Sequence, residues 1–224
     1  IQGTKLNDML TGDAESNIIN AGLGTDEVYG LAGDDSLYGA YAANNFSMDS
    51  SSNDGTDLLF GGAGNDLLVG GAGDDELDGG LGQDILWGDD KQDYDDVYAP
   101  TASDGQEGGG SDTFVIRAGD GGLTLDAADI IMDFEDGSDQ IVLTDGLIFN
   151  DLIITQGDGD YINDVVIRYL DEYLAVVKDM EISELDYFDV LVNNGESVNA
   201  FGTELDDVLL GGSSDDVFST ATGT

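Results

Sequence analysis

The sequence predicts an all-β protein, a parallel β-roll (a β-helix solenoid) of nonapeptide repeats with a C-terminal β-rich capping region. One observation is a nine-residue unit, Gly-Gly-x-Gly-x-Asp-x-U-x, where U is a large apolar residue. It reads GGAGNDLLV from Gly61, GGAGDDELD from Gly70 and GGLGQDILW from Gly79. A second observation is that similar units keep the same phase through the N-terminal half. A third is that residues 112–193 contain short runs rich in β-branched and aromatic residues, separated by Gly, Asp and Asn.

The repeat register extends well before the clearest copies. Earlier copies start at Gly3, Gly12, Ala21 and Gly30. A weak copy, GAYAANNFS, starts at Gly39 and is followed by four extra residues before SNDGTDLLF restores the phase. The eighth position should point into the core, because side chains alternate between the faces of a strand. The eighth-position ladder is Leu10, Ile19, Val28, Leu37, Phe46, Leu59, Leu68, Leu77 and Leu86. The sixth-position ladder is Asp8, Asn17, Asp26, Asp35, Asn44, Asp57, Asp66, Asp75 and Asp84.

The chemistry of the turns favours calcium. Glycine lets the backbone reach positive φ and approach a ligand closely, so a glycine-rich turn exposes its carbonyl oxygens. The Asp at the sixth position adds a carboxylate, and such oxygen ligands suit Ca²⁺, whereas zinc and copper favour nitrogen and sulfur. The chain has no His and no Cys. Because nine-residue units alternate between two sides of a flattened coil, a calcium ion is expected between turns two repeats apart.

The repeats resemble those of the RTX family, the calcium-binding β-rolls of secreted bacterial toxins, proteases, lipases and adhesins. GGGSDTFVI from Gly108 and DIIMDFEDGSDQIVL from Asp129 resemble the segments that follow the roll in that family. The resemblance implies that turn carbonyls and sixth-position carboxylates hold several calcium ions. It pairs Asp57 with Asp75 and Asp66 with Asp84, then Asp35 with Asp57, and finally Asp8 with Asp26. The implied ligand residues are Asp8, Asp26, Gly30, Ala32, Gly33, Asp35, Asp57, Gly61, Ala63, Gly64, Asp66, Gly70, Ala72, Gly73, Asp75, Gly79, Leu81, Gly82, Asp84 and Asp93.

Some copies depart from the pattern. Asn17 and Asn44 place a neutral amide where the other copies have a carboxylate, so calcium sites there should be weaker or absent. The copy from Gly88 is irregular, and either Asp93 or Asp96 holds its sixth position.

The charge of the chain limits its partners. The formal net charge is −44 over 224 residues, with only five basic residues. Nucleic acids and anionic membranes both need a basic surface, so neither is expected as a partner. No apolar run is long enough for a membrane span. Since so many like charges oppose compaction, calcium binding and folding should be coupled.

Four regions are expected along the chain. They are a calcium-binding roll at 1–98, a loop at 99–111, a β-rich capping region at 112–200 and the truncated start of a further repeat block at 201–224. The last region contains GTELDDVLL and GGSSDDVFS. Its alternative is that these two copies dock on the first roll.

The function expected from these features is calcium binding that couples extracellular calcium to folding. The RTX resemblance implies a longer secreted protein with neighbouring domains, exported in one step through a C-terminal signal outside this chain. The alternative is an adhesin, surface-layer or polysaccharide-binding module with a glycan or protein partner. A strip of ninth-position aromatics, Tyr29, Tyr38, Phe60 and Trp87, motivates it, although these rings also suit packing against the cap or loop 39–51. Without His or Cys, no zinc hydrolase, Ser-His-Asp triad or thiol nucleophile is available, so an enzyme is not expected within this chain.

Overall fold

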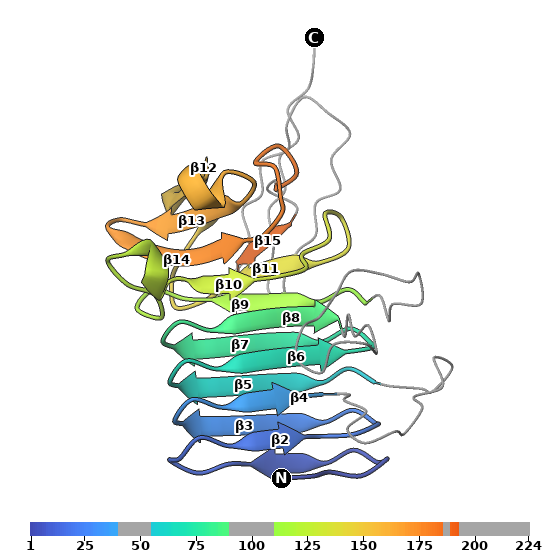
Figure 1. Cartoon of the computed structure of the whole chain (residues 1–224). Helices are drawn as coiled ribbons and strands as arrows, with labels where there is room; N and C mark the ends of the chain where they lie inside the picture. Colours follow the sequence, from blue (N-terminus) through green and yellow to red (C-terminus); the bar gives the residue numbers. More distant parts are fainter. Residues whose placement is uncertain (40–54, 90–109, 186–188, 193–224) are drawn as a thin grey trace.

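Two parallel sheets form opposite walls of a flattened coil (Figure 1). The computed structural model describes residues 1–39, 55–89, 110–185 and 189–192. The first sheet consists, in order, of β1 (Met9–Thr11), β3 (Glu27–Ala32), β5 (Leu58–Ala63), β7 (Glu76–Leu81), β9 (Thr113–Ile116), β11 (Gln140–Leu143) and β15 (Val190–Val192). The second consists of β2 (Ile18–Asn20), β4 (Ser36–Tyr38), β6 (Leu67–Gly71), β8 (Ile85–Asp89), β10 (Asp129–Ile131), β14 (Glu172–Val177), β13 (Val165–Tyr169) and β12 (Leu152–Gln156). This architecture confirms the predicted β-roll.

The core is the ladder of eighth-position side chains between the two sheets. Each strand is only a few residues long, so alternation leaves a single side chain of most copies pointing inward. Ile19, Val28, Leu37, Leu59, Leu68, Leu77 and Leu86 are all 0% exposed. Leu10, in the edge strand β1, is only partly buried. Phe114, Ile131 and Ile141 continue the buried ladder in β9, β10 and β11.

The register confirms a coil of two nonapeptides. Leu10 is opposite Val28, Leu59 is opposite Leu77 and Leu68 is opposite Leu86, each eighteen residues on. Consecutive copies therefore lie on opposite sheets, and copies two apart stack directly.

The weak copy from Gly39 adds no rung to this stack. β3 pairs directly with β5, placing Val28 opposite Leu59, and β4 pairs directly with β6. The prediction that this copy contributes to the two ladders is therefore wrong, and Asn44 and Phe46 themselves lie outside the described residues. The physical reason is that the copy keeps an amide and an apolar residue in phase but has Ala40 and Ala42 in place of the second and third glycines of the turn.

The sheets continue across the boundary expected at residue 98. β7 pairs directly with β9, with Leu77 opposite Phe114, so the next rung above β7 comes after the irregular copy. Asp93 and Asp96, the alternatives for that copy, lie outside the described residues, as do 201–224 and nearly all of the expected loop. Within the described residues no helix is long and apolar enough to cross a membrane.

Beyond β10 the second sheet becomes antiparallel. β14 pairs in parallel with β10, and β13 and β12 then add antiparallel strands. Three short 3-10 helices lie in this part of the described chain, η1 (Leu125–Ala127), η2 (Phe149–Asp151) and η3 (Gly159–Tyr161). Figure 1 shows β12–β14 at the end of the stack away from the N-terminus.

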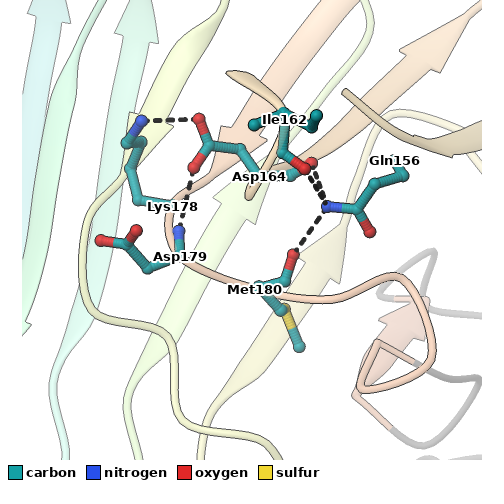
Figure 2. A network of polar contacts seen from close by, with 6 residues as sticks. All are labelled: Gln156, Ile162, Asp164, Lys178, Asp179 and Met180. Atoms are coloured by element: carbon teal, nitrogen blue, oxygen red, sulfur yellow. Dashed lines mark hydrogen bonds and ion pairs between the residues drawn. The ribbon is translucent and has the colours of Figure 1, made fainter. Parts of the chain in front are cut away.

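A buried polar network fixes these antiparallel strands (Figure 2). Asp164 is 1% exposed, accepts a hydrogen bond from Lys178 Nζ at 2.6 Å and accepts another from the Asp179 backbone N–H at 3.0 Å. The Gln156 amide donates to the carbonyl oxygens of Ile162, Asp164 and Met180. This part of the protein thus carries its own cation beside its buried carboxylate.

Candidate calcium-binding turns

The sixth-position aspartates stack in two columns, one along each edge of the coil. In each column, the Oδ1 atom of one aspartate accepts a hydrogen bond from the backbone N–H of the sixth-position residue in the coil below. Asp75 accepts from Asp57 and Asp84 accepts from Asp66, both at 2.8 Å. Asp26 accepts from Asp8, also at 2.8 Å. The stacking predicted for these three pairs is therefore confirmed, while their role as metal ligands stays a prediction.

The predicted pairing of Asp35 with Asp57 is wrong. Asp66 Oδ1 accepts from the Asp35 N–H at 2.7 Å, and Asp57 Oδ1 accepts from the Asp26 N–H at 2.8 Å. The aspartate pairs differ from the prediction because the weak copy from Gly39 adds no strand to the stack. Every later copy therefore lies on the opposite edge of the coil from the edge predicted.

These carboxylates are buried, and several have an oxygen without a hydrogen-bond partner. Asp26, Asp35, Asp66 and Asp84 are at most 2% exposed. Within the part of the chain that the structure describes, their Oδ2 atoms have no protein hydrogen-bond partner. Transferring an ionised carboxylate from water into such surroundings is costly unless a cation or hydrogen bonds compensate it. The turns therefore fit an oxygen-binding cation.

The first glycine of each repeat encloses the carboxylate. A Cβ atom at Gly61 would be 2.5 Å from Asp66 Oδ2 and 2.6 Å from the carbonyl oxygen of Gly79 in the coil above. At Gly70 it would be 2.5 Å from Asp75 Oδ2 and 2.5 Å from the carbonyl oxygen of Gly88. The carboxylate of one turn and a carbonyl of the next thus converge where only glycine leaves room.

The predicted backbone ligands lie in these turns. Gly30–Gly33, Gly61–Gly64 and Gly79–Gly82 stack on one edge, and Gly70–Gly73 lies on the other. The carbonyl of Ala63 accepts from the Gly33 N–H and that of Leu81 accepts from the Gly64 N–H, both at 2.9 Å. A carbonyl oxygen has a second lone pair, so these bonds leave it able to ligate a cation.

Burial also shifts the protonation of the stacked aspartates. It raises the pKa of Asp66 to about 6, against the lowering effect of the hydrogen bond from the Asp35 N–H. It raises the pKa of Asp84 to about 7, and the neighbouring carboxylates Asp66 and Asp78 add to this. The pKa values of Asp26 and Asp35 are raised by the same desolvation. A cation that replaces the proton on these carboxyl groups must therefore compensate the free energy that the ionised group loses when burial removes its water.

Three further aspartates extend the two columns. Asp112 Oδ1 accepts from the Asp75 N–H at 2.9 Å, Asp129 Oδ1 from the Asp84 N–H at 3.0 Å and Asp139 Oδ1 from the Asp112 N–H at 3.0 Å. These residues follow the predicted roll, and the nine-residue pattern did not assign them to the ladder. Their signal was an Asp before a short apolar run, as in SDTFVI and ADIIM.

A second ladder at the fifth position was also missed. Asp34 Oδ1 accepts from the Asn65 N–H, and Asn65 Oδ1 accepts from the Gln83 N–H, both at 2.9 Å. Among the described residues, no group of three or more acidic side chains is arranged to hold one metal ion. A cation in these turns therefore requires backbone oxygens beside the carboxylates.

Asn17 shows how a turn closes with an amide. Its Nδ2 donates to Asp13 Oδ1 at 3.1 Å and to the Glu15 carbonyl at 2.8 Å, and its Oδ1 accepts from the Asp13 N–H. The amide of Asn17 thus uses both its nitrogen and its oxygen in hydrogen bonds within the turn, whereas the carboxylates of Asp66 and Asp84 have an oxygen without a protein partner among the described residues.

The ninth-position aromatics do not form one strip. Tyr29 and Phe60 lie side by side in the first sheet, with ring centroids 5.0 Å apart and stacked. Tyr38 and Trp87 lie on the second sheet, each opposite Val69. Because the two sheets are opposite walls of the coil, the predicted continuous strip is wrong.

A parallel β-roll with stacked aspartates in glycine-rich turns defines the class of this protein. The RTX calcium-binding nonapeptide repeat family matches the sequence in four copies, over residues 2–39, 51–86 and 201–224. These parts of the chain are therefore RTX repeats of the calcium-binding kind.

The chain is similar to the extracellular lipase LipA from Serratia marcescens, at 18% identity and a TM-score of 0.42, covering 85% of this chain and 39% of the lipase chain. It is also similar to the AlgE6R3 subunit of the Azotobacter vinelandii mannuronan C5-epimerase, at 20% identity and a TM-score of 0.33, covering 96% of this chain and 93% of that one. This chain thus spans 39% of the lipase's length. No curated protein matches.

Proposed function

We propose that this chain is a calcium-dependent folding module of a longer secreted protein. In the cell, where calcium is scarce, carboxylate repulsion keeps the repeats expanded and fit for export. Outside, calcium binds the stacked turns and closes the coil. The neighbouring domains of the same protein carry any catalytic or binding activity. Extracellular modules bind calcium with dissociation constants of about 10⁻⁴–10⁻³ M, which suits a switch between these compartments.

The observation that carries this proposal is the buried column of carboxylates with unpartnered oxygens. Asp66 and Asp84 are at most 2% exposed, and their Oδ2 atoms have no protein partner within the described residues. A fold that buries these groups is unstable with all of them ionised and uncompensated. Ca²⁺ supplies two charges per ion and accepts carboxylate and carbonyl oxygens at flexible coordination, so it matches the donor set of these turns.

The ligands of each ion are proposed to come from two consecutive turns of one column. Asp66 and Asp84 supply carboxylates on one edge, and Asp57 and Asp75 supply them on the other. Carbonyl oxygens of the Gly-Gly-x-Gly segments complete the sites. Several ions are expected, because each column repeats the same arrangement at every coil.

A calcium titration of metal-free protein tests the proposal. Far-ultraviolet circular dichroism should change cooperatively from a coil-like to a β-sheet spectrum as calcium rises into the millimolar range, and magnesium should not substitute. Magnesium is the informative control because it keeps its water ligands and demands near-octahedral geometry. A β-sheet spectrum already complete in the presence of chelator would contradict the proposal.

A further inference from the structure

The last residue of β8 is a buried carboxylate, Asp89, that the repeat pattern does not predict. Asp89 occupies the second position of its repeat and is opposite Gly71, the second-position glycine of the coil below. Gly62 and Gly80 hold the same position in other copies. Asp89 is nevertheless only 4% exposed, and its Oδ1 atom has no hydrogen-bond partner in the part of the chain that the structure describes.

Other carboxylates surround Asp89. Asp133 accepts hydrogen bonds from the Gly88 N–H at 2.9 Å and the Asp89 N–H at 3.1 Å, one with each oxygen, so its side chain is fixed against this turn. Asp112 Oδ1 accepts from the backbone of the coil below, and its Oδ2 would be 2.3 Å from a Cβ atom at Gly88. Asp112 thus presents its second oxygen to the residue next to Asp89.

Among the residues that the structure describes, the charged groups that act on Asp89 are all acidic. Asp112 has the strongest electrostatic influence, followed by Asp133, Asp139 and Glu135. Together with burial, which is the larger cause, they raise the pKa of Asp89 to about 8. The basic side chains nearest this end of the described roll have other partners, since Arg117 pairs with Asp78 and Lys178 pairs with Asp164. A buried carboxylate among like charges requires a cation to remain ionised.

We propose that Asp89, at the end of β8, and Asp112, just before β9, bind a divalent cation between them, in addition to the ions held by the nonapeptide turns. Asp133 and Asp139 are positioning residues, because Asp133 accepts hydrogen bonds from the Gly88 and Asp89 N–H groups and Asp139 accepts one from the Asp112 N–H. Oxygen-only ligands make calcium the expected ion. This inference rests on the proposed calcium binding and adds to it a site outside residues 2–39 and 51–86, the nearest parts matched by the repeat family.

Counting bound ions in the full-length chain tests this site. Native mass spectrometry at a calcium concentration that just saturates the wild type should find one ion fewer in Asp89→Asn. Asp89→Gly, which restores the usual residue of the repeat, should lose the same ion. Asp136→Asn is the matched control, because Asp136 is exposed in the turn that follows Asp133. Circular dichroism in calcium should show that all variants are folded.

The outcomes distinguish failure of the proposed Asp89 site from failure of the proposed calcium-dependent folding. Equal ion counts in Asp89→Asn, Asp89→Gly and the wild type would overturn the proposed site while leaving the repeat sites intact. A wild-type protein that binds no calcium would instead overturn the proposed function.

Discussion

The roll and the antiparallel strands β12–β14, which form the cap discussed here, bury carboxylates in opposite ways. In the cap, Asp164 is paired with Lys178 at 2.6 Å and receives a backbone hydrogen bond as well. In the roll, Asp66 and Asp84 receive one backbone hydrogen bond each, and their second oxygens have no protein partner among the described residues. The cap therefore compensates the charge of Asp164 from its own sequence, whereas the proposed function requires a cation from solution to compensate the roll. Calcium should therefore control the folding of the roll more than that of the cap.

The largest expected effect is the pH dependence of the metal-free roll. The folded-state pKa of Asp84 is raised to about 7 from the ordinary 3.8, and that of Asp112 is also raised to about 7. Such groups bind more protons in the folded state, so the stability they contribute is present below pH 3.8 and is lost as pH rises through about 7. Metal-free protein should therefore retain more β-sheet structure at pH 5.5 than at pH 8.

Calcium should remove this dependence, because it competes with protons for the same oxygens. The β-sheet signal in circular dichroism at both pH values, with chelator and with calcium, tests this. Metal-free protein that is more stable at pH 8 than at pH 5.5 would be inconsistent with uncompensated buried carboxylates.

The second prediction removes the internal cation of the cap. Lys178→Met leaves Asp164 buried without its partner and should lower the free energy of unfolding by about 2–3 kcal/mol. Chemical denaturation in saturating calcium measures the loss. The double variant Lys178→Met with Asp164→Asn should recover part of the stability, since the amide keeps the acceptor for the Asp179 N–H. A cap unaffected by Lys178→Met would show that the ion pair contributes little.

A third prediction concerns a single ligand of the roll. Asp75→Asn keeps the Oδ1 acceptor for the Asp57 N–H but removes the charge. The calcium concentration at the folding midpoint should rise about tenfold, or about 1.4 kcal/mol. Glu76→Gln is the matched control, because Glu76 is the next residue and points to the outer face of β7. Equal shifts for the two variants would mean that net charge, and not the column, determines calcium affinity. Asp78 is unsuitable as a control because it pairs with Arg117.

The smallest expected effect is a gain in stability from Leu31→Gly. Leu31 has a φ of 85° at the position where Gly62 and Gly80 have φ values of 110° and 95°. A left-handed backbone costs a non-glycine residue about 1–2 kcal/mol, and glycine's larger unfolded-state entropy offsets part of this. The variant should be more stable by up to about 1 kcal/mol. Leu81→Gly, at an exposed turn position without positive φ, should bring no gain.

The sequence predicted the roll well because its two ladders are local and periodic. The inward residues Leu59, Leu68 and Leu77 and the stacking of Asp57 on Asp75 follow directly from the nine-residue phase. The weak copy at Gly39 was misassigned because phase alone does not show whether a turn has the glycines that let the coil close. Asp129 was missed because it stacks on Asp84 across forty-five residues, where no period remains.

The cation inside the cap was beyond sequence reasoning for a similar reason. Lys178 and Asp164 meet through the antiparallel pairing of β13 with β14, which the repeat pattern does not describe. The same holds for Asp89, whose burial depends on strands before and after a long connection. In each case the local sequence gives the residue type, but only the three-dimensional pairing gives its neighbours.

Hydrogen–deuterium exchange of the full-length chain, with calcium and with chelator, tests the central claim most directly. If the roll depends on an external cation, chelation should abolish protection in β3–β8, whose turns bury Asp66 and Asp84 with an Oδ2 atom that has no protein partner among the described residues. It should reduce protection in β12–β14 much less. Protection of β3–β8 that is unchanged by chelator would contradict the claim that the roll depends on an external cation.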